Sequence, residues 1–149
     1  MTPVRAGHFD WASWQSLLDK AERDLATFRA GPDYPLDVLF NLVTTINHVW
    51  DWASKDANLP HAKRQAAKAV RTIPDVSAIR SLAEAAKHLN LDWMPQATTD
   101  TTHHGWGDMA WGSAPWGGGT TYRVEVNGTM RDVADVAADA ITAWRNAMT

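Results

Sequence analysis

The chain has 149 residues, of which 45% are hydrophobic and 21% charged, a composition typical of one folded domain and not of a disordered chain. Its formal net charge of −3 argues against a domain-wide basic field, so any contact with nucleic acid has to be local. The absence of cysteine excludes disulfides, thiolate metal ligands and a thiol nucleophile.

Residues 1–10 contain one Arg and no apolar run, and no stretch of about 18 consecutive apolar residues occurs in the sequence. The sequence therefore predicts neither a signal peptide nor a membrane span. Together with the lack of cysteine, this favours a cytoplasmic location with no membrane partner.

The first predicted helix covers about residues 11–30. Apolar residues recur there at steps of three and four from Trp11 to Phe28, which is typical of a helix with one buried face. Asp10 is a suitable N-cap, and Gly31 followed by Pro32 marks the end of the helix, because Gly adopts the left-handed conformation and Pro cannot continue a helix.

The second predicted helix begins near Pro35 and has an apolar stripe wide enough for the centre of a bundle. The stripe consists of Leu36, Leu39, Phe40, Val43, Ile46, Val49, Trp50 and Ala53. Polar residues stack along the other flank, at Asn41, Thr44, Thr45, His48 and Asp51.

Two further helices are predicted before the middle of the chain. A short, Ala-rich connector from Pro60 to Arg71 carries four basic residues, and its weak apolar face indicates a peripheral position. Asp75 can cap the next helix, whose buried positions are Val76, Ile79, Leu82, Ala83, Ala86 and Leu89.

The region from Met94 to Gly119 has no periodicity and is predicted to be a loop, or a strand followed by a long loop. Alternation over Tyr122, Val124 and Val126, followed by the turn pair at residues 127–128, predicts a β-hairpin. Asp132 then caps a last helix that continues to residue 148 and has Trp144 on its buried face. We therefore expect a single mainly α (α+β) domain over residues 1–149, a bundle of four longer helices with a short connector helix, a β-hairpin and a Gly/Trp-rich loop.

The first candidate site is the group Asn47, His48 and Asp51 on the second helix. Helical spacing can place the carboxylate beside the imidazole, which would make a general base or a pair of metal ligands. The alternative interpretation is a buried hydrogen bond between the two side chains, or simple exposure to solvent.

The second candidate site is the polar side of the fourth helix, with Arg80, Glu84, Lys87 and His88. An Arg and a His on one face can bind a phosphodiester and move a proton, since the guanidinium stabilises anionic oxygens. The alternative is a solvated helix face with ion pairs between neighbouring turns.

A metal site would need His103 and His104 to join His48 or His88. Adjacent residues of a strand point to opposite faces, and no metal-binding motif of known spacing occurs in the sequence. The sequence therefore predicts no metal and no cofactor.

Three tryptophans, Trp106, Trp111 and Trp116, each lie next to a glycine in the Gly-rich region. Exposed indoles on a flexible backbone could stack on a base, a sugar or a side chain of a protein partner. The alternative is that they cover the hydrophobic core as a lid.

Three segments carry a resemblance to known proteins: TTINHVWDW at Thr44–Trp52, IRSLAEAAKHLNL at Ile79–Leu91, and the Asn-Gly hairpin that leads into the last helix. The chain resembles a group of bacterial and phage helical proteins that are similar to the HEPN superfamily. Many members of that superfamily are metal-independent ribonucleases that use an Arg and a His on one helix. The resemblance implies Arg80 and His88 for these roles.

Seven residues lie between Arg80 and His88, more than the superfamily usually has, and an eight-residue step rotates the His by about 80° from the Arg. Non-catalytic members serve as binding or dimerisation modules, which the resemblance equally allows. We therefore expect an intracellular, self-associating protein, a homodimer, that binds an anionic or nucleotide ligand or acts on RNA. The alternative function is a protein-interaction module that uses the Trp-rich loop.

Overall fold

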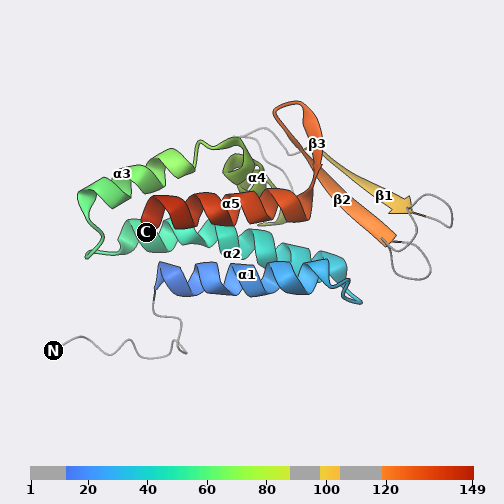
Figure 1. Cartoon of the computed structure of the whole chain (residues 1–149), viewed down its shortest axis with the longest axis horizontal. Helices are drawn as coiled ribbons and strands as arrows, with labels where there is room; N and C mark the ends of the chain where they lie inside the picture. Colours follow the sequence, from blue (N-terminus) through green and yellow to red (C-terminus); the bar gives the residue numbers. More distant parts are fainter. Residues whose placement is uncertain (1–12, 88–97, 105–118) are drawn as a thin grey trace.

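The computed structural model of the chain describes residues 13–87, 98–104 and 119–149. That part forms five helices and a small antiparallel sheet (Figure 1), which confirms the expected mainly α fold. The helices are α1 (Trp14–Arg29), α2 (Pro35–Lys55), α3 (His61–Val70), α4 (Pro74–Lys87) and α5 (Val133–Met148), and the strands are β1 (Thr99–His104), β2 (Gly119–Val126) and β3 (Thr129–Asp132). None of these helices is both long and apolar enough to cross a membrane.

Helix α1 begins at Trp14, three residues later than the sequence pattern predicts. The reason is a local cap: the Ser13 hydroxyl accepts a hydrogen bond of 3.3 Å from the backbone N–H of Ser16. Asp10, the predicted cap, lies outside the described residues. The predicted end of the helix is confirmed, because Gly31 has a φ of 73° and donates to the carbonyl of Phe28.

Helix α2 is central in the bundle, as its apolar stripe predicts. It runs antiparallel to α1 in Figure 1 and packs against α1, α4 and α5. Leu42, Ile46 and Val49 are almost fully buried there and meet the buried faces of the neighbouring helices. Burial of apolar side chains between these helices is the main source of stability of such a bundle.

The apolar stripe of α2 is narrower than the sequence analysis predicts. Leu36 and Phe40 are exposed, at 60% and 47% of their surface. Helical periodicity explains the error, since Phe40 precedes Asn47 by seven residues and lies within about 20° of it on the helix surface. The two apolar side chains therefore lie on the Asn47 flank of α2, in the first two turns of the helix, where they stay exposed.

The sheet has the strand order β1-β2-β3, with both pairs antiparallel. The predicted hairpin joins β2 to β3, and Asn127 and Gly128 both have positive φ, at 50° and 77°, as a tight two-residue turn requires. Asp132 then caps α5, as predicted, by accepting a hydrogen bond of 2.7 Å from the N–H of Ala134.

An arginine in β3 fixes the start of α4 against α5. Arg131 forms ion pairs with Asp75 at 2.5 Å and with Asp139 at 2.6 Å. Asp75 was expected to cap this helix. It lies instead inside the first turn, because α4 begins at Pro74, and its carboxylate pairs with Arg131. This contact helps to hold α4 beside α5, where the two helices enclose the pocket described next.

Candidate functional site

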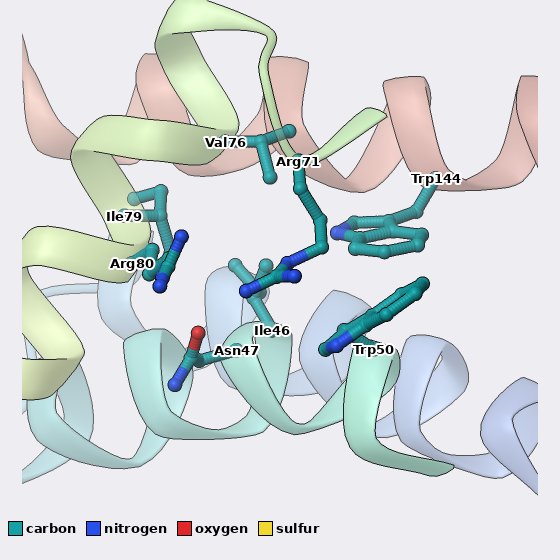
Figure 2. Close-up of a pocket in the computed structure, with 8 residues that line it drawn as sticks. All are labelled: Ile46, Asn47, Trp50, Arg71, Val76, Ile79, Arg80 and Trp144. Carbon is teal, nitrogen blue, oxygen red and sulfur yellow. The ribbon is translucent and has the colours of Figure 1, made fainter. Parts of the chain in front are cut away.

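A small pocket opens where α2, α4 and α5 meet the turn between α3 and α4. Its volume is about 250 Å³ when the open solvent at its mouth is included. The described residues that line it are Ile46, Asn47, Trp50, Arg71, Val76, Ile79, Arg80 and Trp144 (Figure 2). The pocket thus has an apolar floor and several polar groups that reach it from different elements.

Arg71 brings the first positive charge to the pocket. It follows α3 directly, as its C-terminal cap residue, and its guanidinium carbon lies 4.7 Å from the centre of the Trp50 ring, within cation–π range. No hydrogen bond or ion pair joins this guanidinium to any other described residue. Its planar donors are therefore available to a group that enters the pocket.

Arg80 brings a second positive charge from α4. The pKa of Arg71 is lowered by its partial burial and by repulsion from the Arg80 charge, while the carboxylate of Asp51 raises it. The Arg80 guanidinium thus lies close enough for its charge to act on Arg71. The pocket thus receives two positive charges, with the Asp51 and Glu84 carboxylates nearby, although the chain as a whole is slightly acidic.

A hydrogen bond connects the polar flanks of α2 and α4 beside this pair. The Asn47 amide donates from Nδ2 to Oε1 of Glu84 at 3.3 Å. With Nδ2 engaged there, the carbonyl oxygen of Asn47 points toward the space between the Arg71 and Arg80 guanidinium groups in Figure 2. Asn47, a residue of the first candidate site, thus faces the Arg80 helix.

Trp144 contributes an indole from α5. Its side chain is 1% exposed, and its Nε1–H has no hydrogen-bond partner among the described residues. Figure 2 shows this nitrogen at the edge of the indole that faces Arg71. A buried indole N–H normally finds a partner, so this donor is unusual and points to the pocket as the place where one can bind.

The described residues that line the pocket offer hydrogen-bond donors. None of the eight described residues that line it is a His, a carboxylic acid or a Lys, the groups that usually carry protons at neutral pH. Guanidinium and indole N–H groups act as donors, and they match the acceptor oxygens of an anion. The arrangement can therefore hold an oxyanion.

The residues predicted on α2 have different positions relative to this pocket. Asn47 lines it, whereas His48 is exposed and lies about 100° further around the helix, so it does not line the pocket. Asp51 is exposed as well, yet it is close enough to raise the pKa of Arg71. The predicted catalytic roles of His48 and Asp51 stay predictions.

The site residues predicted on α4 also differ in their position relative to the pocket. Arg80 lines the pocket, Glu84 is bonded to Asn47, and Lys87 is exposed at the end of the helix. His88 lies outside the described residues, as do Trp106, Trp111 and Trp116. The predictions for these four residues therefore stay predictions.

Six of the eight described lining residues are not among the predicted site residues, and Arg71 and Trp144 are two of these six. Arg71 was assigned to a peripheral basic helix, and Trp144 to the buried face of the last helix. The signal that would have suggested Arg71 is its position in sequence, since it ends the basic run and lies nine residues before Arg80. For Trp144 the sequence contains no such signal. In the described part of the chain no group of His, Asp or Glu side chains is placed to hold a metal ion.

Comparison with known proteins finds no matching family model, no matching curated protein and no matching solved structure.

Proposed function

We propose that the chain binds an anionic, nucleotide-like ligand, whose anionic group enters the pocket between Arg71 and Arg80. The convergence of these two guanidinium groups on one small pocket is the observation that carries the proposal. An arginine presents several N–H donors in a rigid plane, which suits oxyanions better than a single ammonium does.

The electrostatic cost of this arrangement supports the proposal. Two partly buried like charges repel each other, and the lowered pKa of Arg71 reflects both the burial and the repulsion. A bound anion would convert the repulsion into two attractive contacts, strengthened by the low dielectric of a partly buried site. Functional sites often hold groups that disfavour the unliganded fold in this way.

Cleavage of RNA is a second candidate, and one observation favours it. Arg80, to which the HEPN resemblance assigns the phosphate-binding role, lines the pocket. His88 would supply the proton transfer in that mechanism. Incubation of labelled RNA with the wild type and with His88→Ala tests this candidate, and equal cleavage by the two proteins would refute it.

Calorimetric titration with adenosine monophosphate tests the proposed binding. We expect one ligand per chain and a loss of affinity of about tenfold or more in Arg80→Gln, because a hydrogen bond to a charged group contributes about 1.5–3 kcal/mol. Arg23→Gln is the matched control, since Arg23 is exposed on α1, which contributes no residue to the pocket. Equal loss of affinity in both variants would show non-specific charge attraction and contradict the proposal.

A further inference from the structure

The unpaired indole N–H of Trp144 adds a recognition element that the two arginines do not provide. Arg71 and Arg80 are partly exposed and could attract any anion, whereas Trp144 is fixed in the core with its donor at the pocket. A neutral, immobile donor contributes little attraction at long range. It can, however, select a ligand that places an acceptor atom deep in the pocket.

The polar groups around the pocket arrive from several directions. In Figure 2, Arg71 and Arg80 lie on the side of α4 and the turn before it, Trp144 lies on α5, and Asn47 approaches from α2. A planar carboxylate offers two oxygens in one plane, but a tetrahedral oxyanion offers oxygens to donors that do not share a plane. The arrangement therefore favours a tetrahedral group.

Asn47 adds the one acceptor in this set. Its amide nitrogen donates to Glu84, which leaves its carbonyl oxygen turned toward the pocket. A carbonyl oxygen binds an O–H group and not a bare anionic oxygen. A terminal phosphate can carry such a proton near neutral pH, because its second pKa is about 6, whereas an internal phosphodiester and sulfate cannot.

The size of the pocket limits what can enter it. The empty space among its lining residues is about 250 Å³ and includes the open solvent at the mouth, so the enclosed part of the pocket is much smaller. At most one end of a ligand can lie between the lining residues, and the rest has to remain outside. This agrees with a terminal group and not with a segment in the middle of a chain.

We infer that the pocket is a terminal-phosphate site, in which one phosphate oxygen accepts from Nε1 of Trp144, the arginines bind the other oxygens and Asn47 accepts from the phosphate O–H. This inference rests on the proposed anion binding and specifies its ligand class. Inorganic phosphate and the phosphate of a nucleoside monophosphate share this chemistry. The specificity is against diesters and sulfate.

Spectra of the indole N–H groups in ¹⁵N-labelled wild-type protein test the contact with Trp144 directly. The signal of Trp144 is assigned by its loss in Trp144→Phe at low temperature. Addition of inorganic phosphate is expected to shift the Trp144 proton signal downfield, as a new hydrogen bond to an anion requires. If phosphate binds with arginine-dependent affinity but leaves this signal in place, the inference is overturned and the proposed function stands.

A matched panel of small anions tests the ligand class with the wild-type protein, so the result does not depend on whether a variant folds. We expect methyl phosphate to bind at least about tenfold more tightly than dimethyl phosphate or sulfate, since both of these lack the O–H group that Asn47 accepts from. Comparison of inorganic phosphate with adenosine monophosphate then distinguishes a free anion from a nucleotide. Equal affinity for methyl and dimethyl phosphate would overturn the inference, and binding of none of these anions would refute both proposals.

Discussion

Replacement of Arg71 by Gln is expected to change the free energy of unfolding little in the absence of ligand. The variant loses the contact with Trp50, and a cation–π interaction at a partly exposed site contributes about 0.5–1 kcal/mol. It also removes a charge whose partial burial, together with repulsion from Arg80, lowers the pKa of Arg71. The two changes oppose each other, so we expect a net difference below about 1 kcal/mol.

The same variant is expected to lose about half of the stabilisation that phosphate provides. At a phosphate concentration of 100 times its dissociation constant, binding stabilises the wild type by about 2.7 kcal/mol. If the loss of the Arg71 donors weakens binding about tenfold, the same concentration stabilises the variant by about 1.4 kcal/mol. The predicted difference is therefore about 1.3 kcal/mol, which is well within experimental reach.

Urea unfolding, with phosphate or with chloride at equal ionic strength, measures this difference. Phosphate also stabilises folded proteins in general by exclusion from their surface, so the wild type and Arg23→Gln are run in parallel. We expect equal stabilisation in those two proteins. Equal stabilisation in Arg71→Gln as well would refute the claim that this guanidinium binds the anion.

Three further predictions follow from the geometry. His48→Gln is expected to leave phosphate affinity unchanged in calorimetry, because His48 is exposed and does not line the pocket, and a tenfold loss would place the imidazole at the site. Ile79→Ala, at a position with no exposure, is expected to lower the free energy of unfolding by about 3 kcal/mol, whereas Ile73→Ala, at 37% exposure, lowers it by less than about 1 kcal/mol, and similar values would contradict the packing of α4. Gly128→Ala is expected to cost about 1 kcal/mol in urea unfolding through its positive φ alone, since no atom lies within 4 Å of the added Cβ, and a neutral result would argue against this turn.

Local signals in the sequence were sufficient for most of the fold. The residue pair at 127–128 determines the hairpin turn, Asp132 caps α5, and Gly31 ends α1, each through a contact or a dihedral angle within a few residues. The errors at Leu36 and Phe40 have a similarly local origin. An apolar stripe extended around too much of the helix includes positions that tertiary packing leaves in solvent.

The pocket could be predicted in part. Helical spacing indicated Asn47 as a candidate residue of α2 and placed Arg80 and Glu84 on one face of α4, and the hydrogen bond from Asn47 to Glu84 joins the two helices. Arg71 and Trp144 reach the same pocket through the path of the α3–α4 turn and the packing of α5. These are long-range properties of the fold, which spacing along a single helix does not encode.

Equilibrium dialysis with radiolabelled phosphate tests the central claim most directly. The wild type and Arg23→Gln are predicted to bind one phosphate per chain with equal affinity, and the double variant Arg71→Gln/Arg80→Gln is predicted to bind none at the same concentrations. Retention of the bound phosphate by the double variant would contradict the assignment of this pocket as an anion site.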